Sequence, residues 1–208
     1  MSQPPARRYW HRITLAGHRF QLLNLDHPEV SARILGDLDA GIAVTYDRRW
    51  NVTARFARFL LTNPQWVAER EILVLGAGVG LETLVIGSLC AHLYLNDLAP
   101  SALALGAEQL QHNGITHFTC LCGRYETLPL PPVDLLVGCY LVYSRDTAAA
   151  MRQLLARSTP PVLLGNDNLL SWQSLLRTTT RPYRPLLPPD DLPCVLFDGE
   201  TSAPETPL

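Results

Sequence analysis

A chain of 208 residues, 47% of them hydrophobic and 17% charged, is long enough for one folded domain with a full core. This composition excludes a chain that is disordered throughout. The formal net charge of -2 gives no support to broad electrostatic binding of nucleic acid or an anionic membrane, and we expect neither partner. Because the first residues are polar and basic and no apolar run is long enough to span a membrane, we expect a cytoplasmic protein.

The five cysteines and six histidines show no spacing typical of a disulfide framework or a metal site. Four of the cysteines lie in apolar runs that are predicted to be strand or helix interior. We therefore expect reduced, buried thiols and no metal. The cysteines are Cys90, Cys120, Cys122, Cys139 and Cys194.

The N-terminal part of the chain is predicted to be an extension of the main domain. Residues 1–8 are expected to form a disordered tail, and the extension itself covers 9–50. Within it, apolar and polar residues alternate over 10–25 around an Ala-Gly pair, which predicts a β-hairpin. Residues 27–47 are interpreted as a loop-rich connector with a single helical turn.

Regular secondary structure is predicted from residue 51 onward. Residues 51–62 carry apolar side chains at helical spacing, with Asn51 as the predicted N-cap and Asn63-Pro64 as the end. Strands and helices then alternate, and 181–199 is predicted to form two extended segments around a proline-rich turn. The predicted strands are 71–76, 92–97, 117–122, 133–140 and 160–166, and the predicted helices are 79–90, 99–114, 145–158 and 168–176.

Continuous apolar strands of this kind are typical of a parallel sheet that is covered on both faces. Repeated βα units that end in a hairpin indicate a doubly wound α/β fold. The predicted fold class is therefore a Rossmann-like α/β domain over 51–200, with a mostly parallel seven-stranded sheet, a C-terminal antiparallel hairpin and an N-terminal β-hairpin and helix extension. Residues 201–208 are expected to be a second disordered tail.

Three glycines alternate directly after the first predicted strand of the domain, at Gly76, Gly78 and Gly80. Glycine lets a backbone approach a ligand closely, and the start of the following helix offers unpaired amides. The dinucleotide fingerprint needs a glycine where this chain has Leu81, which argues against an NAD-dependent dehydrogenase, and a triphosphate-binding loop needs a Gly-Lys pair that this segment lacks. The loop is therefore predicted to approach a ligand closely without the usual provision for pyrophosphate or triphosphate.

Asp97 ends the second predicted strand, 21 residues after Gly76. A carboxylate at this place can accept hydrogen bonds from both ribose hydroxyls of a bound nucleoside. It can also cap the following helix, whose first turn holds Pro100. Because strand end, acid and glycine loop occur together, the ribose role is favoured.

The segments ILVLGAGVGLETL (72–84), LYLNDLAP (93–100) and VDLLVGCYLVYSRD (133–146) resemble motifs of class I S-adenosylmethionine-dependent methyltransferases. Within that class the chain resembles the seven-strand protein lysine methyltransferases, particularly the electron-transfer-flavoprotein β-subunit lysine methyltransferase group, over about residues 10–199. The resemblance implies S-adenosyl-L-methionine as cofactor, with the glycine loop around its methionine part, Asp97 on the ribose, and the segment after the third strand on the adenine. The cofactor-contacting residues that it implies are Gly76, Ala77, Gly78, Gly80, Asn96, Asp97, Arg124, Tyr125 and Cys139, with Tyr46 and Asp47 lining the mouth.

Two positions depart from the pattern of that family. The family has an acid two residues before the first glycine, which helps to position the cofactor's amino group; this chain has Val74, and the task is expected to pass to Glu82 or Asp97. After the fourth strand the lysine enzymes read D-x-x-Y, whereas this chain reads YLVY (140–143), so that Tyr140 takes the place of the acid. Tyrosine is a poor proton acceptor at neutral pH, which counts against a lysine substrate more than against methyl transfer in general.

Three carboxylates are candidates to replace the missing acid. Asp146 is predicted to cap a helix and Asp134 to start a strand, whereas Asp167 follows the fifth strand at the sheet edge where the ligand is expected. The candidate catalytic residues are therefore Tyr140, Tyr143 and Asp167.

The predicted function is an S-adenosylmethionine-dependent methyltransferase that acts on a protein side-chain nitrogen, as in lysine. One alternative keeps the cofactor and changes the acceptor to a small molecule. Another is a catalytically inactive methyltransferase fold that serves as a binding or regulatory protein. The sequence predicts no oligomeric state.

Overall fold

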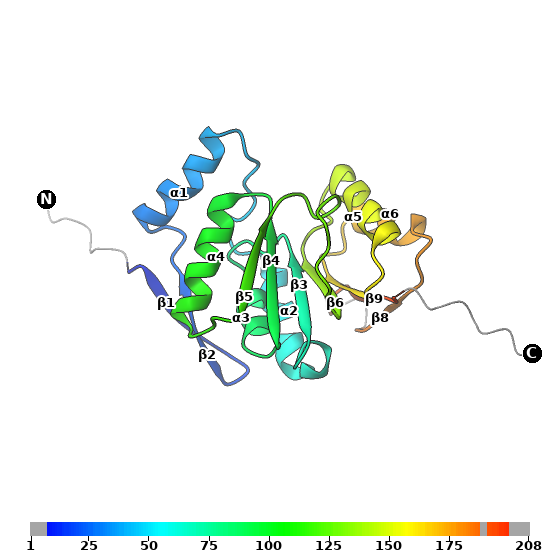
Figure 1. Ribbon diagram of the computed structural model, residues 1–208, viewed down its shortest axis with the longest axis horizontal. Helices are drawn as coiled ribbons and strands as arrows, with labels where there is room; N and C mark the ends of the chain where they lie inside the picture. The colour runs from blue at the N-terminus through cyan, green and yellow to red at the C-terminus, as the bar shows by residue number, and fades with distance from the viewer. Residues whose placement is uncertain (1–7, 188–190, 200–208) are drawn as a thin grey trace, which may run out of the picture.

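The computed structural model describes residues 8–187 and 191–199 (Figure 1). In this part of the chain one seven-stranded sheet carries helices on both faces, and a separate two-stranded hairpin lies near the N-terminus. The strands of the large sheet are β3 (Glu71–Leu75), β4 (His92–Asp97), β5 (Phe118–Cys122), β6 (Leu135–Cys139), β7 (Val162–Gly165), β8 (Tyr183–Pro185) and β9 (Cys194–Phe197). The helices are α1 (Pro28–Asp39), α2 (Asn51–Thr62), α3 (Leu81–Gly87), α4 (Pro100–His112), α5 (Arg145–Arg157) and α6 (Leu170–Thr178), and a 3-10 helix spans Pro64–Trp66.

The strand order of the large sheet is β5-β4-β3-β6-β7-β9-β8. The five strands from β5 to β7 are parallel to one another, whereas β9 runs antiparallel to both β7 and β8. The predicted fold class is therefore confirmed, including the mostly parallel seven-stranded sheet and its C-terminal hairpin. The order reverses at β3, because β4 leaves it on one side and β6 on the other, and ligands of open α/β sheets bind at such a switch point.

Alternate side chains of β3 enter two different core clusters. Ile72 and Val74 pack with residues of α2, α3 and α4 on one face. Leu73 and Leu75 pack with residues of α5 and α6 on the other face. A strand that buries both faces has to be apolar at every position, which is why this segment shows no alternation in the sequence.

The predicted N-terminal hairpin is confirmed as β1 (Trp10–Leu15) and β2 (His18–Leu23). Its turn places Ala16 and Gly17 at positive φ, as a two-residue hairpin turn requires. Side chains of α4 and of its C-cap bind the backbone of β2: Asn113 bonds both the N–H and the C=O of Gln21, at 2.9 and 2.8 Å, and the Oε1 of Gln109 accepts from the N–H of Leu23 at 2.9 Å. The extension is therefore tied to the βα domain through α4.

The predicted connector over 27–47 is wrong in one respect, because it contains the twelve-residue helix α1. The His27 side chain caps the helix by accepting from the N–H of Glu29, and proline is favourable in the first turn that follows. Val30 and Ile34 are buried on one face. Val30, Ile34 and Leu38 recur at helical spacing in the sequence, but a glycine inside the segment, Gly36, argues against a helix there and obscured the pattern.

Two predicted helix caps are also wrong by one or two residues. Trp50 occupies the N-cap position of α2, so the predicted cap Asn51 is the first helical residue. Ser144, and not Asp146, caps α5, and its side chain forms a capping box with Thr147. The helices themselves are where the sequence predicts them, because apolar periodicity locates a helix better than its ends.

Three of the five cysteines are buried, as expected, but Cys120 and Cys122 are exposed on the edge strand β5. All five are free thiols. Apart from Arg8, whose carbonyl accepts a 2.8 Å hydrogen bond from Asn24, the predicted tails (1–8 and 201–208) lie outside the described residues, as do residues 188–190 of the predicted proline-rich turn.

No membrane-spanning helix occurs among residues 8–187 and 191–199, since none of the helices there is both long enough and apolar enough.

Candidate functional site

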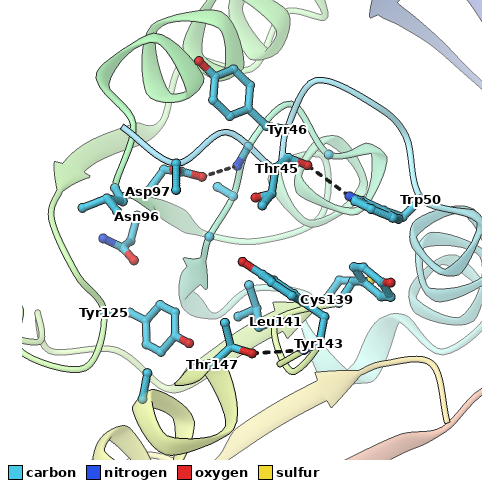
Figure 2. Close-up of a pocket in the computed structure, with 18 of the residues that line it drawn as sticks. Thr45, Tyr46, Trp50, Asn96, Asp97, Tyr125, Cys139, Leu141, Tyr143 and Thr147 are labelled. Carbon is cyan, nitrogen blue, oxygen red and sulfur yellow. Dashed lines mark hydrogen bonds between the residues drawn. The ribbon is translucent and has the colours of Figure 1, made fainter. Parts of the chain in front are cut away.

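A cavity of about 540 Å³ opens at the carboxyl ends of β3, β4 and β6, beside the switch point (Figure 2). Its size is that of a site for a cofactor or a small molecule. Its wall combines the glycine loop, the ends of β4 and β6, the loop 123–126, one face of α5 and the segment 43–53. Segments far apart in the sequence therefore meet at the place that the fold favours for a ligand.

The glycine loop between β3 and α3 forms the floor of the cavity. Gly76 and Gly78 adopt φ values of +51° and +49°, which side chains disfavour. A Cβ atom at Gly76 would lie 2.6 Å from the side chain of Leu141, and one at Gly78 would lie 3.3 Å from Tyr46. Glycine is therefore required here both by the backbone conformation and by the space available.

The Asp97 carboxylate is fixed by two backbone amides. Its Oδ2 accepts from the N–H of Gly78 at 2.9 Å, and its Oδ1 accepts from the N–H of Ala99, the N-cap residue of α4, at 3.0 Å. Burial raises the pKa of this carboxyl, and the amide hydrogen bonds lower it. Asp97 thus does bond the helix start, but each oxygen keeps a further lone pair that can accept from a ligand.

Two buried side-chain oxygens in the cavity wall have no hydrogen-bond partner within the described residues: Asn96 Oδ1 and Glu82 Oε2. The Asn96 amide is oriented by its nitrogen, which donates to the carbonyls of Leu121 and Gly123 at 3.0 and 2.8 Å. Buried polar atoms are nearly always paired in folded proteins. Two orphaned acceptors in one cavity wall indicate that a ligand with donor groups completes them.

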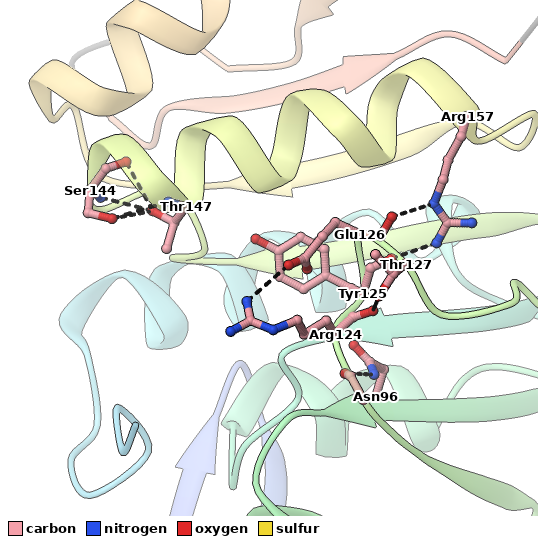
Figure 3. A network of polar contacts seen from close by, with 9 residues as sticks. Asn96, Arg124, Tyr125, Glu126, Thr127, Ser144, Thr147 and Arg157 are labelled. Carbon is pink, nitrogen blue, oxygen red and sulfur yellow. Dashed lines mark hydrogen bonds and ion pairs between the residues drawn. The ribbon is translucent and has the colours of Figure 1, made fainter. Parts of the chain in front are cut away.

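The loop after β5 is held by Arg157 in the last turn of α5 (Figure 3). Its guanidinium donates to the carbonyls of Tyr125, Glu126 and Leu128 at 2.6 to 2.7 Å. The loop presents Arg124 and Tyr125 to the cavity, and Arg124 pairs with the Glu126 carboxylate at 3.1 Å. Burial raises the pKa of the Tyr125 phenol, which stays neutral.

Aromatic side chains surround the mouth of the cavity. The Tyr140 ring is stacked between Trp50, at 4.5 Å between centroids, and Tyr143, at 6.0 Å. Arg48 lies 5.3 Å from the centroid of the Trp50 ring. Tyr140 itself has φ of +56°, an outlier for a bulky residue, and its N–H donates to the carbonyl of Gly165 at 2.8 Å. Strained backbone held by its surroundings is common at functional sites.

Three further polar groups lie in or beside the cavity. Asp167 is outside the cavity wall, and its Oδ1 lies 4.0 Å from the guanidinium of Arg55. Asp146, in the first turn of α5, is exposed and lines the cavity. The thiol of Cys139 is neutral, because burial and then the nearby charge of Glu82 raise its pKa.

No protein-family model matches the chain, and no curated protein matches its sequence. Solved methyltransferase structures match its fold. The 16S rRNA N2 G1207 methyltransferase RsmC of Thermus thermophilus does so with a TM-score of 0.64 and 16% identity, over 94% of this chain and 52% of that chain. A putative S-adenosyl-L-methionine-dependent methyltransferase from Methanococcus maripaludis gives 0.56 and 12%, over 73% and 87%. The N-methyltransferase NodS of Bradyrhizobium japonicum gives 0.50 and 16%, over 70% and 94%.

The fold is that of the class I S-adenosylmethionine-dependent methyltransferases. Identities of 12 to 16% establish the fold alone. The chain spans about half the length of the Thermus methyltransferase, which was solved with AdoMet and guanosine.

Within this methyltransferase fold, the structure brings together nearly all residues that the sequence singled out. The nine predicted cofactor residues line the cavity, as do Tyr140, Tyr143 and Tyr46, whereas Asp167 and Asp47 do not. Sequence reasoning missed Trp50 and gave Asp146 only a capping role. The position of Asp146 in the first turn of the helix that follows β6, near the carboxyl edge of the sheet, was a usable signal. Nothing in the sequence marks Trp50 as a partner of Tyr140.

Proposed function

We propose that this protein is an S-adenosylmethionine-dependent methyltransferase. The observation that carries the proposal is the pair of orphaned buried acceptors, Asn96 Oδ1 and Glu82 Oε2, in the wall of a glycine-floored cavity. A nucleoside with an amino-acid tail has donor groups that can complete both acceptors. The Asp97 carboxylate lines the same cavity and is pre-oriented by backbone amides, so that ribose hydroxyls can donate to it.

The remaining cavity groups fit the other parts of this cofactor. Gly76, Gly78 and Gly80 line the cavity with backbone, against which the methionine part can lie closely. Arg124 and Tyr125 present flat faces for an adenine, on a loop that Arg157 holds in place. The chain therefore offers a surface for each part of the cofactor without any change in fold.

The chemistry that the protein has to promote is a displacement at a methyl group. Bound S-adenosylmethionine supplies a methyl group on a positively charged sulfur, which leaves as a neutral thioether when the acceptor nitrogen takes the methyl. The protein's task is to align a neutral nucleophile and keep water out. The Tyr140 phenol does not act as a base, since burial and then the charge of Asp167 raise its pKa. Catalysis by positioning is what these residues support.

We propose a lysine-like side-chain nitrogen as the acceptor, consistent with the resemblance to the lysine methyltransferase group. The stacked rings of Trp50, Tyr140 and Tyr143 at the mouth support this, because an apolar aromatic surrounding favours the neutral amine. The second candidate is a small-molecule acceptor. Two observations favour this second candidate. Tyr140 occupies the position where the lysine enzymes have an acid, and Asp167, the predicted replacement for that acid, lies by Arg55 and not in the cavity wall.

Transfer of a radiolabelled methyl group separates these acceptors. The purified protein is incubated with labelled S-adenosylmethionine and a cell extract, which is then divided into protein, RNA and small-molecule fractions. We expect label in the protein fraction, at lysine after hydrolysis, and none with Asp97→Asn. Label confined to small molecules would select the second candidate, and label in RNA would contradict the expectation drawn from the net charge. Binding of the cofactor without transfer to any fraction would favour an inactive binding protein.

A further inference from the structure

The carboxyl group of Glu82 lies directly over the glycine loop. Glu82 is the second residue of α3, yet a Cβ atom built on Gly80 would meet its Oε1 at 2.5 Å, its Cδ at 2.6 Å and its Oε2 at 2.7 Å. The side chain therefore folds back from the helix against the backbone of the loop. The residue is only 5% exposed and belongs to the cavity wall.

This carboxyl group is buried without a compensating partner. Its Oε2 accepts no hydrogen bond, and no arginine, lysine or histidine among the described residues forms an ion pair with it. Burial raises the pKa of Glu82 to about 7, and a hydrogen bond from its own backbone amide offsets this only in part. Buried carboxylates are normally paired, so an isolated one at a cavity wall indicates a cation that the protein chain does not supply.

Val74 leaves the strand beneath the glycine loop without a carboxyl group that could take the role of Glu82. It lies in β3, two residues before the glycine loop, is 1% exposed, and packs in the same apolar cluster as Leu81 and Leu84 of α3. The strand end beneath the loop therefore carries no charge on this face of the sheet. Glu82 brings a carboxyl group to the glycine-loop end of the cavity, whereas Asp97 already accepts from the amides of Gly78 and Ala99 and is assigned to the ribose.

We infer that the Glu82 carboxylate binds the α-ammonium group of the cofactor's methionine part. The inference rests on the proposed function and names the residue that recognises the amino-acid end of the cofactor. S-adenosylmethionine has two cationic centres, but only the ammonium carries N–H donors that can complete an orphaned oxygen. The sulfonium interacts with a carboxylate by charge alone. The three ligands S-adenosylmethionine, S-adenosylhomocysteine and 5′-methylthioadenosine separate these contributions, because the second lacks the sulfonium and the third lacks the amino-acid part as well.

Calorimetric titration of Glu82→Gln with the three ligands tests the inference. We expect S-adenosylmethionine and S-adenosylhomocysteine each to bind about 10- to 100-fold more weakly than to the wild type, the loss that follows from one charge-assisted hydrogen bond. Binding of 5′-methylthioadenosine should stay within about twofold, which also shows that the isosteric variant is folded. Weaker binding of S-adenosylmethionine alone would place the sulfonium at Glu82 and overturn the inference. An equal change for all three ligands, or no change, would give Glu82 a structural role and overturn it too.

Two carboxyl variants in the same cavity serve as matched controls. Glu126→Gln makes the same substitution at a buried carboxylate of the adenine-side loop, and Asp97→Asn changes the carboxylate assigned to the ribose. Both should alter the affinities of the three ligands by the same factor, because all three share the nucleoside. If the wild-type protein binds none of the ligands, the proposed function fails and the inference fails with it, an outcome distinct from selective loss in Glu82→Gln.

Discussion

The inner end of the cavity and its mouth are lined by different kinds of residues (Figure 2). At the inner end, Asn96 and Glu82 are 1% and 5% exposed, and the Asp97 carboxylate is fixed by backbone amides that belong to the fold itself. At the mouth, Tyr143 is 43% exposed, and the rings of Trp50 and Tyr140 stack on one another at the edge of the core. The inner end is thus buried and polar, whereas the mouth is aromatic and more exposed.

This difference indicates that the inner end binds the cofactor and that the mouth selects the acceptor. Backbone amides and buried carboxyl groups lie at the carboxyl ends of the strands, which is where open α/β sheets bind their ligands. Exposed side chains on loops change without disturbing the sheet, and they determine which acceptor can enter. We therefore expect substitutions at the inner end to act on cofactor affinity and substitutions at the mouth to act on transfer.

Asp97→Asn should reduce the affinity for S-adenosylmethionine and S-adenosylhomocysteine by about 100-fold or more, measured by calorimetry. The amide keeps one acceptor but turns an NH2 group toward a donor, either the N–H of Gly78 or that of Ala99. Asp134→Asn is the matched control, since its carboxylate also accepts from a backbone amide, that of Glu71, but at the opposite end of β3. Equal losses in both variants would show that the effect comes from the fold and not from the cavity.

Glu82→Gln should stabilise the ligand-free protein at alkaline pH. Burial raises the pKa of Glu82 to about 7 in the folded state, so between about pH 4.5 and pH 7 the folded protein binds more protons than the unfolded chain. Stability therefore falls as the pH rises through this window. The advantage of the variant in free energy of unfolding should grow by about 2 kcal/mol between pH 5.5 and pH 8, measured by urea denaturation.

The same comparison shows whether Glu82 titrates as described. A difference between wild type and variant that does not change with pH would mean that the Glu82 carboxyl is paired in the free protein. Saturating S-adenosylmethionine should reduce the difference, because the bound ammonium compensates the wild-type carboxylate.

Arg157→Ala should weaken cofactor binding by about 3- to 10-fold. The loss is smaller than for Asp97→Asn because Arg157 acts on the ligand only through the loop carbonyls that it bonds (Figure 3). Arg181→Ala is the control, since that guanidinium also bonds carbonyls, those of Ser158 and Pro160, away from the cavity. It should lower the melting temperature without changing affinity. A loss of affinity in the control and none in Arg157→Ala would contradict the assignment of the loop.

Tyr140→Asp should alter transfer and leave cofactor affinity within about threefold. Aspartate tolerates the left-handed backbone at this position better than tyrosine, by about 1 kcal/mol, which offsets part of the stacking energy that is lost. If the acceptor is a lysine, the carboxylate should speed methyl transfer to protein at neutral pH several-fold, whereas Tyr140→Phe should not. Unchanged or slower transfer to protein would favour the small-molecule acceptor.

Most of the inner end of the cavity could be predicted from the sequence, because its signals are local. The glycine loop follows an uninterrupted apolar strand, and Asp97 ends the next one, so the parallel sheet brings them together without any further information. The same continuity located the seven strands and the closing hairpin. The orphaned oxygen of Glu82 could not be predicted, since it depends on how one side chain folds back over Gly80.

The mouth was harder to predict because its contacts are long-range. The stacking of Trp50 on Tyr140 joins residues 90 positions apart in a part of the chain without periodicity. Helix α1 was missed although its apolar residues recur at helical spacing, because Gly36 lies inside it. Asp167 was preferred because it follows the fifth strand, and Asp146 was predicted to be a helix cap. The cavity wall, however, includes Asp146 and leaves Asp167 beside Arg55. Such choices depend on side-chain direction, which the sequence pattern does not contain.

The most direct test of the account is calorimetric titration of the purified wild-type protein with S-adenosylmethionine and, separately, with S-adenosylhomocysteine. The account predicts saturable binding of both at one site per chain, with dissociation constants of about 1 to 100 μM. No detectable binding of either ligand at about 1 mM would contradict it, because the buried oxygens of Asn96 and Glu82 would then require another explanation.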